Sequence, residues 1–397
     1  MIQFDDAYGK VLAHIQDFGT ETVLLANSNG RILAEDVLAD RDFPPFNRAT
    51  KDGIAFWFDG VDTSKPIQIE AVLGAGSPSI AIKNKANCVE IMTGAVVPKN
   101  ANTVVMYEHI EIKDGSATLI KTPKKGQNIH AKGSDEAKGT VVLNANTKIS
   151  PAEIGVLASV GKSEVLVKKL PIITTIATGN ELVEVTEIPL PHQIRKSNMH
   201  SLYTALEREG IRPKHLHLQD DKESIALALQ KALQENDVLL LSGGVSKGKF
   251  DFIPDALQEL GVEKVFHRIA QRPGKPFWFG VHKATNTVVF SFPGNPASTF
   301  ANYHIYFKDW LYASLGIPIQ KFEVILSDAF ENTTPLTRFL RVNTHLKKGV
   351  LGANIILGNG SGDLTSLAKS DGFIRLKPNT NYKKGACVPF TPTRNII

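Results

Sequence analysis

The stretch DVLLLSGGVSKGKFD, residues 237–251, is an apolar run followed by a glycine-rich loop that carries cations and an acid. Four consecutive apolar residues, 238–241, bounded by polar residues and glycines, predict a short β-strand that is buried on both faces. Gly243 and Gly244 leave room for backbone N–H groups to approach an anion. The stretch therefore predicts one strand of a parallel sheet, ending in a phosphate-binding loop.

Strands and helices alternate on both sides of this stretch, over residues 170–316. PIITTIATG (171–179) and TVVFSF (287–292) have the composition of buried strands, and ESIALALQKALQE (223–235) has that of an amphipathic helix. Such alternation favours a mostly parallel α/β sheet with helices on both faces. Before the helix that covers Leu202 and Leu206, Ser197 or Asn198 is expected to act as the N-cap.

The rest of the chain favours further, mostly β domains, so that the fold class is α/β and β multidomain. Short alternating runs separated by turn residues predict a β-rich module over 46–140. We expect an α/β domain over 170–316 and a C-terminal β-barrel over 317–397. Residues 1–45 and 141–169 flank the β-rich module, and a helix is expected to begin at Pro151.

Composition excludes several classes of protein. Hydrophobic residues make up 42% and charged residues 21% of the chain, which is typical of a folded globular protein. No apolar run approaches the roughly 20 residues that span a bilayer, and the N-terminus lacks a signal-peptide pattern. Cys88 and Cys387 lie far apart and predict neither a disulfide framework nor a zinc site. A cytoplasmic protein without a membrane partner is therefore expected.

The positive charge is concentrated near the C-terminus. Residues 318–397 contain seven Lys and four Arg against five acids, a net charge of +6, whereas the whole chain has +5. This region has neither a basic run nor an RNA-binding signature, so we expect no nucleic-acid partner. A small anionic ligand at a domain interface accounts for the charge, and an ordinary solvated surface is the alternative.

Three polar loops follow predicted strands of the α/β sheet. Ligands of open α/β sheets bind beyond the carboxyl ends of the strands, so these loops are the predicted binding region. The loops are Thr178-Gly179-Asn180-Glu181, Ser242-Gly243-Gly244 and Pro293-Gly294-Asn295-Pro296.

The second loop has nearly the spacing of a P-loop. Gly243, Gly248 and Lys249 satisfy GxxxxGK, but Phe250 stands where the Mg²⁺-binding hydroxyl should be. A P-loop ATPase is therefore disfavoured. An anion cradled by the glycines, with Asp251 positioning a metal or substrate, is favoured over a plain strand-to-helix turn.

Charged side chains near these loops suggest an oxyanion and a metal. Arg272-Pro273-Gly274-Lys275-Pro276 holds two cations on a stiff turn, which lowers the entropy lost on binding an anion. Mg²⁺ prefers oxygen ligands and bridges to substrate phosphates, although most loop carboxylates are merely solvated. The acids beside glycines or in expected loops are Asp52, Asp135, Glu181, Asp220, Asp221 and Asp251.

A set of segments, in this order, resembles the MoeA-type molybdopterin molybdenumtransferases, a family related to the gephyrin E domain. The resemblance covers essentially the whole chain, and the ordered set is far more specific than any one piece. The segments are NRATKDGIAF (47–56), EIMTGAVVP (90–98), KGSDEAKG (132–139), ATGNEL (177–182), IRKSN (194–198), LLLSGGVSKGKFD (239–251), RPGKP (272–276), FPGNPAS (292–298) and GSGDLTSLAKSDG (360–372).

The resemblance implies an elongated homodimer of four-domain subunits, in which residues 1–45 plus 141–169 form a linker and dimerisation domain and the α/β domain is similar to the molybdopterin adenylyltransferases. It implies a transferase that inserts molybdate into adenylated molybdopterin and releases AMP with the help of Mg²⁺. The implied partners are adenylated molybdopterin, molybdate, a second copy of the chain and the molybdopterin adenylyltransferase. The pterin sulfurs hold the molybdenum, which agrees with the lack of a cysteine ligand set.

The resemblance also implies roles for individual residues. Asp52 and Asp135 would reach the site from the partner subunit, so that the active site would require the dimer. The implied catalytic residues are Asp52, Asp135, Glu181, Asp220, Asp251 and Lys275. The implied substrate-binding residues are Thr93, Thr178, Gly179, Ser242, Gly243, Gly244, Ser246, Arg272, Pro293, Gly294, Asn295, Ser298, Arg338 and Ser361. The implied metal ligands are Glu181, Asp220, Asp221 and Asp251.

The sequence departs from the family pattern at five positions. Lys51 replaces a Met, Arg272 replaces a Lys, and acids are replaced at Ser134, Asn180 and Lys196. The lost acids put the metal affinity in doubt, but the core acids persist, so an active and divergent enzyme is expected. A molybdopterin adenylyltransferase and a catalytically weak binding or scaffolding protein are the alternatives.

Overall fold

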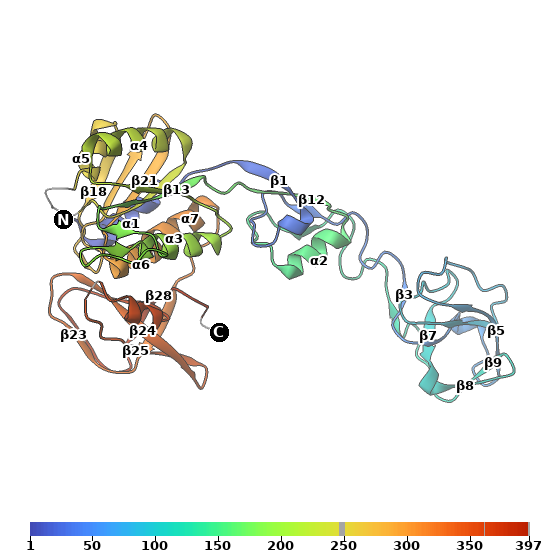
Figure 1. Ribbon diagram of the computed structural model, residues 1–397. Coiled ribbons are helices and arrows are strands. Elements are labelled where there is room, and N and C mark those ends of the chain that lie inside the picture. Colours follow the sequence, from blue (N-terminus) through green and yellow to red (C-terminus); the bar gives the residue numbers. More distant parts are fainter. Residues whose placement is uncertain (246–250, 361, 396–397) are drawn as a thin grey trace. The chain divides into compact units, whose positions relative to one another are not determined.

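The computed structural model describes residues 1–245, 251–360 and 362–395 (Figure 1). The chain divides into two compact units. The larger unit contains Met1–Glu21, Gly30–Ile32 and Leu166–Ile397, and the smaller unit contains Thr22–Asn29 and Leu33–Val165. The predicted boundaries of four domains stay a prediction.

A six-stranded sheet forms the centre of the larger unit, in the order β16-β13-β17-β21-β20-β18. The first four strands pair in parallel and the last two are antiparallel, which confirms the predicted mostly parallel sheet. β13, β17 and β21 are buried along their whole length, as strands covered on both faces must be. The bounds are β13 Ile173–Thr178, β16 Lys214–Leu218, β17 Val238–Ser242, β18 Glu263–His267, β20 Trp278–His282 and β21 Thr287–Phe292.

Helices cover both faces of this sheet (Figure 1). Neighbouring side chains of β17 alternate between the faces: Leu240 packs into a core with α1, α3, α6 and α7, and Leu239 into a core with α4 and α5. A π-helical segment, Tyr303–Phe307, joins α6 to α7. The bounds are α1 Phe4–Leu12, α3 Ser197–Glu207, α4 Lys222–Glu235, α5 Ile253–Glu259, α6 Pro296–Asn302 and α7 Lys308–Ser314.

The C-terminal part of the larger unit is a closed barrel of five strands, as predicted. The strands follow one another as β24-β25-β22-β28-β26, and β26 pairs back onto β24. β19 (Gln271–Arg272) pairs in parallel with β24 and so joins the α/β part to the barrel. The barrel bounds are β22 Phe322–Leu326, β24 Thr337–Lys347, β25 Val350–Ile355, β26 Gly372–Leu376 and β28 Cys387–Pro392.

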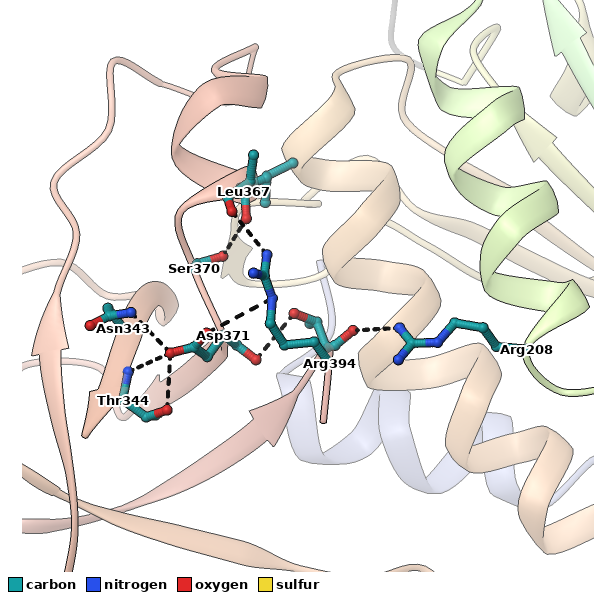
Figure 2. Close-up of polar contacts among 9 residues, drawn as sticks. Arg208, Asn343, Thr344, Leu367, Ser370, Asp371 and Arg394 are labelled. Atoms are coloured by element: carbon teal, nitrogen blue, oxygen red, sulfur yellow. Dashed lines mark hydrogen bonds and ion pairs between the residues drawn. The ribbon is translucent and has the colours of Figure 1, made fainter. Parts of the chain in front are cut away.

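Asp371 lies at the centre of a polar network in the barrel (Figure 2). Its Oδ2 accepts hydrogen bonds from the backbone and hydroxyl of Thr344 at 2.7 and 3.0 Å, and from Asn343 at 3.1 Å. Its Oδ1 lies 3.8 Å from Arg394 Nε, and Arg208 donates to Thr393 O at 3.4 Å. The network ties the C-terminal tail to β24 and to the residue that follows α3.

The smaller unit is mostly β, as predicted. Its six-stranded sheet has the order β7-β4-β6-β5-β9-β8. The helix α2 (Pro151–Ser159) begins at Pro151 as expected, and Ser150 and Glu153 form a reciprocal capping box. The sheet bounds are β4 Gly53–Phe56, β5 Ile67–Leu73, β6 Cys88–Ile91, β7 Thr103–Met106, β8 Ile110–Lys113 and β9 Ser116–Leu119.

Three 3₁₀-helices, Leu25–Asn27, Phe58–Gly60 and Tyr107–His109, lie in the smaller unit. The other short elements are strands and one helix. They are β1 Thr20–Leu24, β2 Val37–Leu38, β3 Arg48–Ala49, β10 Ile129–His130, β11 Val141–Leu143, β12 Glu164–Lys168, β14 Leu182–Val183, β15 Ile194–Arg195, β23 Phe330–Asn332, β27 Thr380–Tyr382 and α8 Leu364–Ala368. Among the described residues, no helix has the length and apolar character needed to cross a membrane.

Candidate functional site

A pocket rich in cations lies in the larger unit, between the β21–α6 turn and the barrel, with a volume of about 320 Å³. Arg272 at the end of β19 and Lys275 in the turn after it line the pocket, as do Arg338 and Arg341 of β24. The parallel pairing of β19 with β24 places Arg272 opposite Arg338. We call this cavity the basic pocket. It also contains three of the predicted binding residues, namely Pro293, Asn295 and Ser298.

Arg338 presents a buried hydrogen-bond donor at the basic pocket. Its Nε is buried and, within the described part of the chain, has no hydrogen-bond partner. Burial and the nearby Arg272 guanidinium together lower the pKa of Arg338 from its ordinary value. Two neighbouring guanidinium groups with an unmet N–H favour an anionic ligand, because a buried donor or charge is costly without a partner.

Buried amides fix the turn that carries Arg272 and Lys275. Gln271 Nε2 donates to Asn302 Oδ1 at 2.9 Å and to Pro273 O at 3.0 Å, and Asn302 Nδ2 lies 3.3 Å from Gly274 O. Gly274 has a φ of +87°, and a Cβ there would lie 2.3 Å from Asn302 Oδ1. The turn therefore requires glycine at this position, and its cations are held in place before any ligand binds.

Arg341 is a pocket residue that the sequence did not reveal. Its guanidinium donates to Ser366 Oγ, to Asp363 O at 3.2 Å and to Gly360 O at 3.4 Å. It thereby holds the segment that leads into α8 beside the pocket. Regular strand alternation puts residues 338 and 341 on opposite faces, so the pattern gave no reason to place both in one cavity. The predicted binding residue Ser361 lies outside the described residues.

The glycine loop after β17 adopts the conformation that its composition predicts. Gly243 and Gly244 have φ angles of +105° and +67°, and a Cβ on either would lie within 2.9 Å of Thr178 Oγ1. The Thr178 hydroxyl is itself buried and has no partner among the residues described. Thr178, Gly243 and Gly244 therefore meet at the ends of adjacent strands. Ser246 and the GKF segment of the near-P-loop lie outside the described residues.

Asn198 links two of the predicted loops. Its Nδ2 donates to Ser242 Oγ and to Gly294 O. The prediction that Ser197 or Asn198 caps α3 was wrong: Lys196 is the N-cap residue, without a side-chain cap. Asn198 lies instead in the first turn of α3, where its side chain reaches the ends of β17 and β21.

The acids of the larger unit have separate surroundings. Asp220 and Asn180 bond reciprocally: Asp220 N donates to Asn180 Oδ1 at 3.0 Å, and Asn180 N lies 3.4 Å from Asp220 Oδ2. Asp221 instead caps α4 through Ser224 N at 2.8 Å, and its bonds to the Ser224 hydroxyl and backbone lower its pKa.

Glu181 and Asp251 are the remaining acids of the predicted metal site. Gly179 has a φ of +135°, and a Cβ there would lie 2.3 Å from Glu181 Oε2. Burial lowers the pKa of His267, and the negative charge of Asp251 opposes this shift. His267 Nε2 lies 3.0 Å from Val245 O. In residues 1–245, 251–360 and 362–395 there is no group of three His, Cys, Asp or Glu that could hold a metal ion. Mg²⁺ needs only one or two protein carboxylates beside substrate phosphates, so the Mg²⁺ assignment stays a prediction.

The predicted residues of the smaller unit form two local pairs. Asp52 Oδ1 accepts from Thr93 N at 2.6 Å, and the backbone and side chain of Thr93 lower the pKa of Asp52. Asp135 Oδ1 lies 2.8 Å from His130 Nε2, and His130 Nδ1 lies 3.1 Å from Arg48 Nη2. An Arg48 N–H donating to Nδ1 leaves the His130 proton on Nε2, where it can be donated to Asp135. The sequence did not single out His130.

Two of the departures from the family pattern have a structural explanation. Lys196 pairs with Glu184 across the β14–β15 pair. Asn180 uses its side-chain oxygen to accept the Asp220 N–H, a role that a carboxylate could also fill. Neither replacement leaves an unpaired charge.

Three protein-family models match the chain in succession. "MoeA N-terminal region (domain I and II)" matches residues 2–161, and "Probable molybdopterin binding domain" matches residues 174–312. "MoeA C-terminal region (domain IV)" matches residues 323–393. The second match contains the glycine loop, and the third contains Arg338 and Arg341.

Whole-length relatives agree with these models. A molybdopterin molybdenumtransferase from Synechocystis sp. is 38% identical, covering 98% of this chain and 99% of the relative. One from Bacillus subtilis is 33% identical, covering 98% of this chain and 93% of the relative. The solved structure of the molybdopterin biosynthesis MoeA protein from Pyrococcus horikoshii OT3 has a TM-score of 0.82 and 28% identity, covering 99% of this chain and 100% of the other.

Proposed function

This chain belongs to the molybdopterin molybdenumtransferase family, which acts in molybdenum cofactor biosynthesis, and we propose that it inserts molybdate into adenylated molybdopterin with release of AMP. The buried Nε of Arg338, which has no partner among the described residues and lies beside Arg272, is the observation that carries the proposal. A buried donor of this kind favours an oxyanion that binds among the cations of the basic pocket.

Molybdate occupies the basic pocket in this proposal. Arg272 and Arg338 supply planar N–H groups suited to two oxygens of a tetrahedral dianion, and Lys275 supplies a third positive charge. The hydroxyl of Ser298, at the start of α6, lies in the same cavity. Because the turn is held by Gln271 and Asn302, little entropy is lost when these donors bind the ligand.

The phosphate link of the adenylated pterin lies in the glycine loop. Backbone N–H groups of Gly243 and Gly244 and the Thr178 hydroxyl are the donors, and they stabilise charge that develops when the link breaks and AMP leaves. Glu181, Asp220 and Asp251 would hold Mg²⁺, which when bound neutralises charge on the phosphate oxygens. The capping bonds of Asp221 make it the weakest member of the predicted ligand set.

A homodimer completes the proposed site. Asp52 and Asp135 of a second copy would contribute to it, as the resemblance implies. Within each copy, the bonds of Asp52 to Thr93 and of Asp135 to His130 give each carboxylate a defined orientation. The proposed setting is the cytoplasm, where a molybdopterin adenylyltransferase would supply the adenylated substrate.

A turnover assay tests the proposal. The purified chain is incubated with adenylated molybdopterin, Mg²⁺ and molybdate, and released AMP and formed cofactor are measured. We expect AMP release that depends on molybdate, with a reaction lacking molybdate as the control. Adenylation of free molybdopterin by ATP would support the adenylyltransferase instead, and binding of the pterin without any turnover would support the scaffolding protein.

A further inference from the structure

The basic pocket and the glycine loop are separate sets of donors that must act on one substrate pair. Pro293, Asn295 and Ser298 belong to the pocket, whereas Gly243 and Gly244 belong to the loop after β17. Proximity effects require such groups to hold their relative positions closely, since a misplacement of about 1 Å can lower a rate about 100-fold. A residue that bonds beside both sets can fix their positions relative to one another.

Asn198 is bonded to a direct chain neighbour of each set, Ser242 before Gly243 and Gly294 between Pro293 and Asn295. Its Nδ2 donates to Ser242 Oγ at 2.8 Å, directly before Gly243, and to Gly294 O at 2.7 Å. A weaker contact of 3.4 Å reaches Thr299 Oγ1 in α6. One amide group with two N–H donors thus connects the ends of β17 and β21 and the first turns of α3 and α6.

Further bonds extend from these contacts into both sets. Thr299 Oγ1 donates to Pro293 O at 2.5 Å and lies 3.3 Å from Ser242 Oγ. Gly243 N donates to Phe292 O at 3.1 Å, and a Cβ on Gly294 would lie 3.5 Å from Gly243 Cα. Ser242 and Thr299 are buried, so these bonds exchange little with water. The two loops are packed together, and the side chains of Asn198 and Thr299 each connect them; Asn198 does so from α3.

We propose that Asn198 is a positioning residue that couples the phosphate-binding glycine loop to the molybdate-binding basic pocket. The proposal rests on the proposed function for the identity of the two ligands. In this proposal Asn198 acts by holding Ser242 and Gly294 in place, and it does not contact the reacting atoms. Its effect should therefore be on the alignment of the two bound substrates, and less on the binding of either.

Asn198 is the donor in both hydrogen bonds, so substitutions that remove or reverse the donor test the proposal. In Asn198→Asp the shape is kept but the two donors become acceptors, and a carboxylate faces the carbonyl oxygen of Gly294. In Asn198→Ala the contacts are only removed. If the donors matter, Asp should be worse than Ala, whereas a space-filling role would make Asp the milder change. Thr204→Ala, on the exposed face of α3, is the matched control, because the Thr204 hydroxyl bonds, among the described residues, to carbonyls of its own helix.

The first measurement is steady-state kinetics of molybdate-dependent AMP release. For Asn198→Ala we expect kcat to fall about 10- to 100-fold with a KM for molybdate changed less than about threefold, and a larger fall for Asn198→Asp. Thr204→Ala should match the wild type. A kcat within about twofold of the wild type, a rise in KM alone, or an Asp variant more active than the Ala variant would overturn the proposal.

The second measurement does not depend on turnover. Hydrogen exchange followed by mass spectrometry reports on peptides that contain residues 242–245 and 293–299. We expect faster exchange in both peptides in Asn198→Ala and Asn198→Asp, with the sheet strands unchanged. Unchanged exchange in either peptide would refute the coupling even if the enzyme were active. If the wild-type chain shows no AMP release, the proposed function fails while the exchange data still decide the positioning role.

Discussion

The cations and the acids of the predicted site differ in how the fold arranges them. Arg272 and Lys275 come from one turn and Arg338 comes from β24, yet the fold collects them in one cavity and adds Arg341. The acids of the same unit keep separate environments: Asp220 bonds with Asn180 and Asp221 caps α4. The cluster of cations is therefore formed by the folded chain itself, whereas a metal site would be completed by the phosphates of the substrate.

The difference has a physical origin. Cations repel one another, and the fold keeps them together only because a strand pair and buried amides hold the backbone that carries them. Carboxylates on neighbouring loops can each be satisfied locally by backbone N–H groups. Three predictions test this contrast, beginning with the largest expected effect.

Removal of the central cation should have the largest effect. In Arg338→Ala, we expect the KM for molybdate to rise more than about tenfold and AMP release at limiting molybdate to fall about 100-fold, because a bidentate charge-assisted donor is lost. Arg338→Lys should recover part of the activity. Initial rates over a range of molybdate concentrations provide the measurement.

Arg375→Ala is the control for this change. Arg375 also lies in the barrel, but it pairs with Asp5 and stacks on the Phe4 ring instead of lining the pocket. We expect its molybdate dependence to equal that of the wild type. An unchanged KM for molybdate in Arg338→Ala would show that the basic pocket is not the molybdate site.

Neutralising Asp220 should have a smaller and more specific effect. Asn180 bonds to the backbone N–H of residue 220, so Asp220→Asn keeps this bond and loses only the charge. We expect the Mg²⁺ concentration for half-maximal activity to rise about tenfold, with activity largely recovered at high Mg²⁺. Asp255→Asn, on the exposed side of α5, is the control. Identical Mg²⁺ titrations for Asp220→Asn and the wild type would remove Asp220 from the metal site.

Asp221 should show the smallest effect, and on stability only. Its bonds to Ser224 cap α4 and lower its pKa, so its contribution is complete above the ordinary value of 3.8 and is lost as the pH falls below it. We expect Asp221→Ala to lower the urea midpoint of unfolding slightly at pH 7, and this difference to shrink in acid. Asp221→Asn should retain the cap without the pH dependence. A changed Mg²⁺ dependence of the activity in Asp221→Ala would show instead that Asp221 is a metal ligand.

Much of the fold follows from local sequence patterns. Four apolar residues between Asp237 and Ser242 were enough to predict a doubly buried strand, and Gly243 and Gly244 were enough to predict the loop after it. The prediction of Asn198 as a helix cap failed because its amide finds better partners in two distant loops. Capping chemistry is local, and a side chain near a helix start can be diverted by tertiary contacts.

The sequence by itself determined the alternation of strands and helices, the barrel and the residue types of the site, because period, turn chemistry and charge are properties of short segments. Only the tertiary structure decided that Arg341 joins Arg272 and Arg338, that Asp220 and Asp221 differ, and that Asn198 fastens two loops. Each of these depends on backbone segments that are far apart in the chain and meet only when the sheet and barrel have formed. Tertiary packing determines contacts of that kind, and the pattern of a short segment does not predict it.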